Sequence, residues 1–116
     1  MYYLIIQLFK TEYKEDLLLA LTSCGIEKGS LFEGQNLDKV LQRDYPLFTG
    51  FVRSEDERER YAVLVSTVVD KKERVDELIA LLKEADIDIR KEEILRIILL
   101  PTERILDHET DWEGKA

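Results

Sequence analysis

The chain has 116 residues, the length of one domain with a single hydrophobic core, and its net charge of −8 excludes a sequence-independent nucleic-acid binder, which needs a basic surface. Its one cysteine, Cys24, excludes an internal disulfide and a Cys-x-x-Cys site, and the excess of Glu and Lys over Asn and Gln is a bias of heat-adapted proteins. No apolar stretch reaches the roughly 20 residues of a membrane-spanning helix and no basic leader precedes the first predicted strand, so we expect a cytoplasmic protein without membrane insertion.

The first predicted strand is residues 2–9, where both alternating sets of side chains are mostly apolar. A helix is predicted next, with Thr11 as its N-cap and Gly25 as its left-handed C-cap. Its apolar residues fall on one stripe, so the thiol of Cys24 is expected to be buried and inert. The stripe consists of Tyr13, Leu17, Ala20, Leu21 and Cys24.

A short strand at 30–33 lies between two glycines and has the alternation of an edge strand. Residues 35–60 then form an unusually long connection for a compact domain, and such loops commonly have a function. Within it, residues 37–43 predict one or two helical turns and residues 44–46 predict a turn before proline. Residues 53–60 predict a solvated segment of mixed charge.

Residues 61–69 read Tyr-Ala-Val-Leu-Val-Ser-Thr-Val-Val and predict the central strand, because neither alternating set of side chains suits water. The second helix follows, and Asp70 and Glu73 stand in the positions of a capping box. The last strand, 94–100, is apolar on both sides except for Arg96.

The predicted order of elements is β-α-β-β-α-β, and right-handed crossovers place both helices on one face of the sheet. We therefore predict an α+β fold, a ferredoxin-like βαββαβ sandwich with an antiparallel four-stranded sheet and two helices on one face. This domain is expected to span residues 1–106, ending in a short turn at 102–106. Residues 107–116 are expected to form an acidic, solvated tail.

The second face of the predicted sheet carries large apolar side chains that two helices cannot cover. Apolar patches of this size usually mark an interface. Covering several hundred Å² at about 25 cal/mol per Å² contributes on the order of 10 kcal/mol. We therefore expect a closed homo-oligomer, with a trimer as the first choice.

Three segments stand out by their order and spacing. Residues 20–34 read Ala-Leu-Thr-Ser-Cys-Gly-Ile-Glu-Lys-Gly-Ser-Leu-Phe-Glu-Gly, residues 44–51 read Asp-Tyr-Pro-Leu-Phe-Thr-Gly-Phe, and residues 100–104 read Leu-Pro-Thr-Glu-Arg. They resemble, in this order, the helix–Gly–strand passage, the Pro-hydrophobic-Phe-x-Gly segment and the Pro-x-Glu after the last strand of PII-like proteins. These proteins belong to the PII superfamily of nitrogen-regulatory signalling proteins.

The resemblance implies a homotrimer whose loop at 35–60 projects as a protein-binding element. It also implies a small-molecule effector, in many members an adenine nucleotide, in the cleft between subunits. By position, Gly34 matches the glycine that opens the loop at the cleft, and Pro101 and Glu103 match the strand exit beside it. No resident cofactor is implied. The candidate ligand- or partner-binding residues are Gly34, Gln35, Asn36, Arg43, Phe48, Glu103 and Arg104.

Two departures from the PII pattern disfavour ATP as the effector. Members that bind ATP carry Thr-Gly-x-x-Gly-Asp-Gly-Lys before the last strand, where backbone N–H groups cradle phosphate. Here residues 85–93 read Ala-Asp-Ile-Asp-Ile-Arg-Lys-Glu-Glu, without glycine. The basic Arg-Ile-Arg-Thr-Gly run expected after the last strand is replaced by Leu-Asp-His-Glu-Thr at 106–110.

Single charged residues leave functional and structural interpretations open. Arg43 and Arg96 suit an anionic ligand, but Arg96 in an apolar strand equally suits an acid across a subunit boundary. Residues of the tail with side chains that can ligate a divalent cation are Asp107, His108, Glu109 and Asp111. Clustered acids in a polar tail are more commonly just solvated.

No Gly-x-Ser-x-Gly, His-x-x-x-His or Walker lysine loop is present, so we expect a regulatory protein rather than an enzyme. Two alternatives remain at this point. One is a divalent-cation-binding trimer of the CutA kind, and the other is a small enzyme of the dimeric α+β barrel kind.

Overall fold

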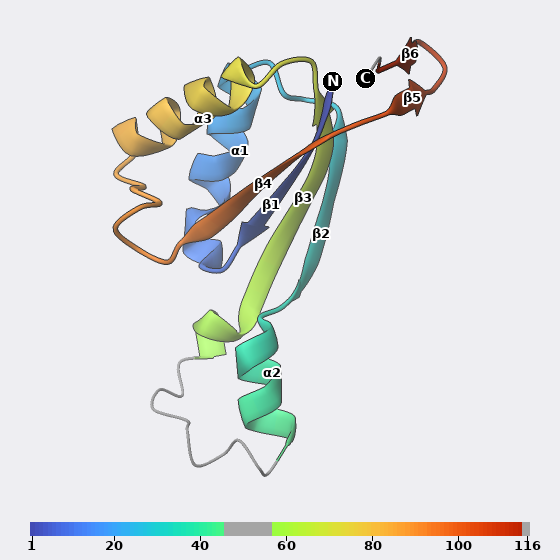
Figure 1. Ribbon diagram of the computed structural model, residues 1–116. Coiled ribbons are helices and arrows are strands. Elements are labelled where there is room, and N and C mark those ends of the chain that lie inside the picture. The colour runs from blue at the N-terminus through green and yellow to red at the C-terminus, as the bar shows by residue number, and fades with distance from the viewer. Residues whose placement is uncertain (46–56, 115–116) are drawn as a thin grey trace.

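The computed structural model describes residues 1–45 and 57–114, and it confirms the predicted α+β, ferredoxin-like fold. A four-stranded antiparallel sheet has the strand order β2-β3-β1-β4, and helices α1 and α3 lie on one of its faces (Figure 1). The strands are β1 (Tyr2–Leu8), β2 (Gly29–Gln35), β3 (Tyr61–Val69), β4 (Leu95–Pro101), β5 (Arg104–Leu106) and β6 (Asp111–Glu113). The helices are α1 (Lys14–Ser23), α2 (Leu37–Asp44) and α3 (Glu73–Glu84), with 3-10 turns η1 (Thr11–Tyr13) and η3 (Glu57–Arg60).

The hydrophobic core lies between the sheet and helices α1 and α3. Leu4 and Ile6 of β1 are completely buried, and so are Leu17 of α1 and Leu78 of α3. Each such aliphatic side chain contributes about 1.5–3 kcal/mol on burial. Cys24 lies in the same cluster, where burial raises the pKa of its thiol, in agreement with the predicted inert cysteine. Among the described residues, no helix combines the length and apolarity needed to cross a membrane.

Both predicted helix N-caps are wrong, whereas the predicted C-cap Gly25 is confirmed by its φ of +75°. Thr11 lies in η1, and no side chain caps α1. Asp70 accepts a hydrogen bond from Nε of Arg74 at 3.1 Å, and this contact lowers the pKa of the carboxyl. The same guanidinium donates from Nη1 to the carbonyl of Cys24 at 3.2 Å. Arg74 and Asp70 therefore connect the start of α3 to the end of α1.

The structure has a hairpin that was not predicted after the sheet, because β5 and β6 pair with Ile105 opposite Trp112. The carboxylate of Asp107 closes the connecting turn by accepting hydrogen bonds from the N–H groups of Glu109 and Thr110, both at 2.8 Å. Strands of three residues are too short to show an alternating pattern in the sequence. The hairpin projects beyond the sheet near the N-terminus (Figure 1).

The sheet face opposite α1 and α3, termed the outer face, carries no helix of the described chain (Figure 1). Phe32 is 55% exposed, Leu100 47% and Val68 41%. Arg96 is the one charged residue of this face, whereas 36% of the whole chain is charged. By strand register, the outer face consists of Tyr3, Ile5, Gln7, Ser30, Phe32, Gly34, Ala62, Leu64, Ser66, Val68, Arg96, Ile98 and Leu100. The structure thus has the uncovered apolar face on which the predicted assembly depends.

Candidate functional site

A pocket of about 360 Å³ opens on the outer face where β2 and β3 leave the sheet, and it is termed the loop-base pocket. The pairing of β1 with β3 stops at Leu8 and Val63, but the β2–β3 ladder continues to Gln35 and Tyr61. This extension forms the base of the long connection at 35–60. The lining residues that matter here are Gln7, Phe9, Phe32, Gly34, Asn36 and Arg96.

Arg96 presents its guanidinium to the loop-base pocket. Its Nη1 donates a hydrogen bond to Oε1 of Gln7 at 3.1 Å, and its guanidinium carbon lies 5.4 Å from the centroid of the Phe9 ring. Gln7 and Arg96 are opposite each other in the β1–β4 ladder, so the register itself brings them together. No carboxylate of a described residue forms an ion pair with Arg96. Its other N–H donors suit a carboxylate or phosphate ligand.

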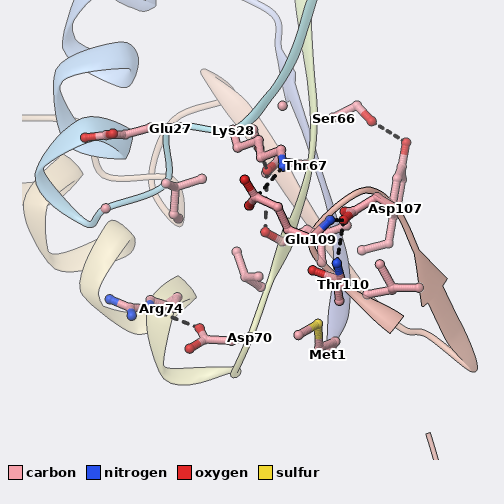
Figure 2. Close-up of a pocket in the computed structure, with 17 residues that line it drawn as sticks. Met1, Glu27, Lys28, Ser66, Thr67, Asp70, Arg74, Asp107, Glu109 and Thr110 are labelled. Carbon is pink, nitrogen blue, oxygen red and sulfur yellow. Dashed lines mark hydrogen bonds and ion pairs between the residues drawn. The ribbon is translucent and has the colours of Figure 1, made fainter. Parts of the chain in front are cut away.

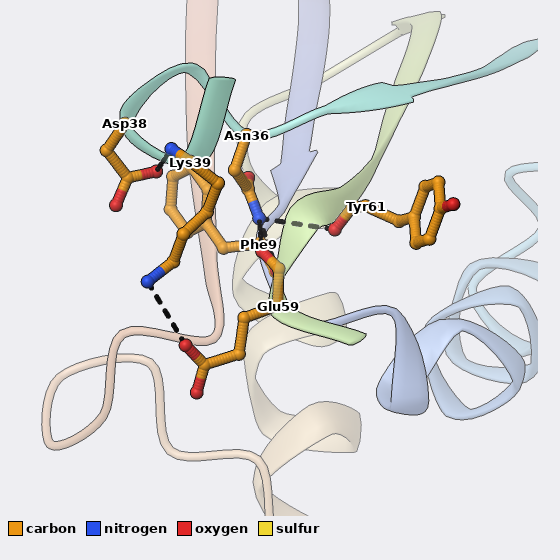
Figure 3. Close-up of polar contacts among 6 residues, drawn as sticks. All are labelled: Phe9, Asn36, Asp38, Lys39, Glu59 and Tyr61. Carbon is orange, nitrogen blue, oxygen red and sulfur yellow. Dashed lines mark hydrogen bonds and ion pairs between the residues drawn. The ribbon is translucent and has the colours of Figure 1, made fainter. Parts of the chain in front are cut away.

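Asn36 connects three segments at the base of the loop (Figure 3). Its Nδ2 donates to the backbone carbonyls of Glu59 at 2.7 Å, Phe9 at 2.9 Å and Tyr61 at 3.2 Å. Its backbone N–H donates to the carbonyl of Arg60 at 2.7 Å. Although Asn36 directly precedes α2, its side chain does not cap that helix. The amide donors of this predicted site residue are therefore engaged by the protein itself.

Two further contacts hold the same base together. Nε of Arg60 donates to Oε1 of Gln35 at 3.0 Å, and Nζ of Lys39 lies 3.2 Å from a carboxylate oxygen of Glu59 (Figure 3). Surface contacts of this kind contribute about 0–1 kcal/mol each. Their importance is positional, because they join the end of β2 and the start of α2 to η3. Any displacement of α2 and any occupant of the loop-base pocket therefore act on the same few residues.

The predicted site residues fall into two groups at opposite ends of the sheet. Gly34, Gln35 and Asn36 line the loop-base pocket. Glu103 and Arg104 follow β4 at the other end. The groups are separated by the length of β3, which has nine residues and therefore spans roughly 25–30 Å. A cleft that includes both groups consequently requires two copies of the chain.

The remaining two predicted residues join neither group. Arg43 lies on α2 with its Nε 3.9 Å from the carboxylate of Asp44, and it does not line the loop-base pocket. Phe48 lies outside the described residues, as does most of the segment at 44–51.

A second hollow, of about 510 Å³, lies between the hairpin turn and the segment that joins α1 to β2 (Figure 2). Nζ of Lys28 lies 3.6 Å from a carboxylate oxygen of Glu109 and links the two walls. The hydroxyl of Thr67 donates to the carbonyl of Lys28. Within the hairpin, Nη2 of Arg104 lies 3.3 Å from Oδ1 of Asp111. Charges of both signs are paired here, so this hollow suits an anion less well than the loop-base pocket does.

We expect the hairpin to lose stability in acid. Hydrogen bonds from the N–H groups of Glu109 and Thr110 lower the pKa of Asp107 below its ordinary value of 3.8. Because the folded-state pKa is depressed, the stabilisation is complete above about pH 5 and is lost as the pH falls through the lowered value. Trp112 is the only tryptophan and lies in β6, so its fluorescence between about pH 5 and pH 2 measures the change.

Asp107→Asn is the matched control for this titration. An amide oxygen accepts the same two hydrogen bonds but does not titrate in this range. The variant is therefore expected to keep the hairpin and to flatten the acid transition of Trp112. Identical pH curves for the two proteins would show that another carboxyl causes the transition.

Three of the four tail residues with cation-ligating side chains have other partners in the structure. Asp107 closes the turn, Glu109 pairs with Lys28, and Asp111 pairs with Arg104. Across residues 1–45 and 57–114, no group of three or more His, Cys, Asp or Glu side chains is arranged to hold a metal ion.

Sequence reasoning missed Gln7 and Phe9 as pocket residues. Gln7 is polar in an otherwise apolar strand, and this is the signal that could have marked it, but its partner is 89 residues away in the sequence.

No protein-family model matches this chain, and no curated protein matches it. The functional interpretation therefore rests on the outer face and the loop-base pocket.

Proposed function

We propose that this chain is a PII-like regulatory protein, a homotrimer without catalytic activity, which binds a small anion in the loop-base pocket. One observation carries the proposal. Arg96, the single charge of the outer face, lines a pocket whose rim is the base of the connection at 35–60. A ligand at that position contacts the residues that orient the connection, which is the arrangement that a sensor needs.

The apolar outer face supports the homotrimer. Phe32, Val68 and Leu100 are large side chains left exposed by a single chain, and copies packed through their outer faces remove them from water. In such an assembly the loop-base pocket becomes a cleft between subunits. Glu103 and Arg104 lie at the opposite end of the sheet, so only a neighbouring copy can bring them to this cleft.

A short chain of contacts couples the pocket to the connection. The guanidinium of Arg96 packs over the ring of Phe9, whose backbone carbonyl accepts a hydrogen bond from Asn36. Asn36 also holds the carbonyl of Glu59 at the other end of the connection. An anion that repositions Arg96 therefore acts on the hydrogen bonds that fix both ends of the connection. The readout is a change in the position of α2 relative to the sheet.

A thermal-shift screen with sodium bicarbonate, citrate, inorganic phosphate, AMP and ATP at constant ionic strength tests this proposal. At a concentration 100 times its dissociation constant, an anion that binds only the folded chain adds about 2.7 kcal/mol of stability. We expect at least one carboxylate or phosphate to raise the melting temperature of the wild type. Arg96→Gln is expected to abolish that shift while leaving the fold and the particle mass unchanged.

Arg90→Gln is the matched control, because Arg90 is exposed and does not line the loop-base pocket. It removes the same charge and is expected to keep the ligand-induced shift. Equal stabilisation of Arg96→Gln and the wild type, or no stabilisation by any of these anions, would contradict the proposed function.

A further inference from the structure

We propose that the free edge of β2 and the groove beside it bind an extended, basic peptide segment of a partner protein by strand addition. The groove, termed the edge groove, lies between α1 and β2 on the face of the sheet opposite the loop-base pocket. It is a site separate from the proposed anion site. Its apolar walls are Leu18 and Leu21 of α1, Ile26, Leu31 of β2, and Val65 of β3.

The edge of β2 provides the backbone half of this site. Among the described strands β2 pairs with β3 alone, and all seven of its residues are exposed. The outward N–H and C=O groups of such a strand match those of an added strand. Proteins usually block such edges with Lys, Pro or unpaired charges. β2 contains no Lys or Pro, and its one charge, Glu33, is neutralised by Lys14 at 2.9 Å.

The edge groove provides the side-chain half. It has a volume of about 400 Å³, and Leu18 and Leu31 at its walls are each 38% exposed. In an added strand, alternate side chains point to opposite faces of the sheet. One set would enter the groove next to Leu31, and the other would lie over Phe32, which is 55% exposed on the outer face. The fitting peptide therefore has apolar side chains at both alternating sets near its centre.

Charge favours a basic peptide as the occupant of the edge groove. Lys28 and Lys14 at this edge are paired with Glu109 and Glu33, whereas Glu27 at the groove forms no ion pair with a described residue. The whole chain has a net charge of −8, so a segment rich in Lys or Arg is attracted to it.

Selection from a displayed library of random ten-residue peptides on the immobilised full-length chain tests this inference. Leu18→Lys places a charge in the edge groove. Leu19→Lys places the same charge on the same helix outside the groove, where Leu19 is 62% exposed. We expect enriched peptides to carry apolar centres and basic flanks. They should bind Leu18→Lys at least about tenfold more weakly than the wild type, and Leu19→Lys within about twofold.

Amide hydrogen exchange gives a second readout. A bound peptide is expected to slow exchange in β2 (Gly29–Gln35). The inference is overturned if no peptide is enriched, if enriched peptides bind the two variants alike, or if the protected amides lie outside β2. It is also overturned if β2 alone becomes protected as the concentration of the free chain rises, because a second copy then occupies the edge.

Discussion

Gly29→Ala is expected to lower the free energy of unfolding by about 1–3 kcal/mol, the usual cost of forcing extra atoms into a packed site. Gly29 opens β2 directly opposite Thr67. A methyl group on it would lie 2.6 Å from the carbonyl oxygen of Ser66 and 2.7 Å from Cβ of Thr67. Neither atom moves without shifting the backbone of β3. The hydroxyl of Thr67, which donates to the carbonyl of Lys28, would be displaced with it.

Gly34→Ala, in the same strand, is the control and is expected to have the opposite sign. A methyl group there meets no atom within 4 Å, and the backbone of Gly34 is outside the left-handed region. Replacing such a glycine stabilises a protein by about 0.4–1 kcal/mol, because the unfolded chain loses freedom. Urea denaturation at one fixed protein concentration measures both variants. If Gly29→Ala and Gly34→Ala have equal free energies of unfolding, the close approach of β2 to β3 at Gly29 is contradicted.

Asn36→Asp is expected to destabilise the chain by about 1–3 kcal/mol, the cost of leaving partly buried polar groups without partners. The substitution keeps the shape of the side chain but replaces Nδ2 by an oxygen. That oxygen would face the carbonyls of Phe9, Glu59 and Tyr61, which would lose the hydrogen-bond donor that Asn36 provides. Asp is normally as good as Asn before a helix. The expected loss therefore reports the bridging role of Asn36 and no capping role.

Gln35→Ala is the matched control for this substitution. Gln35 is exposed, and within the described part of the chain its side chain makes one hydrogen bond, with Arg60. A surface contact of this kind is worth less than about 1 kcal/mol. Urea denaturation is again the measurement. If Asn36→Asp is as stable as the wild type, the three carbonyls are satisfied without the amide and the proposed coupling loses its central residue.

The strands and their order could be predicted because their information is local. Residues 61–69 carry apolar side chains on both faces, and the structure assigns β3 the same bounds. The start of α3 was mispredicted because Arg74 binds the carboxylate of Asp70, and a capping pattern in the sequence does not take that side chain into account. The hairpin was missed because its turn is closed by only two hydrogen bonds, which backbone N–H groups donate to the side chain of Asp107.

The candidate site could be predicted in part. The residues at 34–36 were proposed from the resemblance to PII-like proteins, and they line the loop-base pocket. The pairing of Arg96 with Gln7 was not predicted, because it depends on the register between the first and last strands. Sequence reasoning left an acid across a subunit boundary as the alternative partner for Arg96. The structure places Gln7 and Phe9 of the same chain beside it.

Sedimentation equilibrium of the wild-type chain at micromolar concentration is the most direct test of the claim that other copies cover the outer face. The account predicts a single species with three times the 13.6 kDa mass of the chain. A particle of 13.6 kDa would leave Phe32, Val68 and Leu100 in water, and it would remove the intersubunit cleft together with the proposed regulatory function.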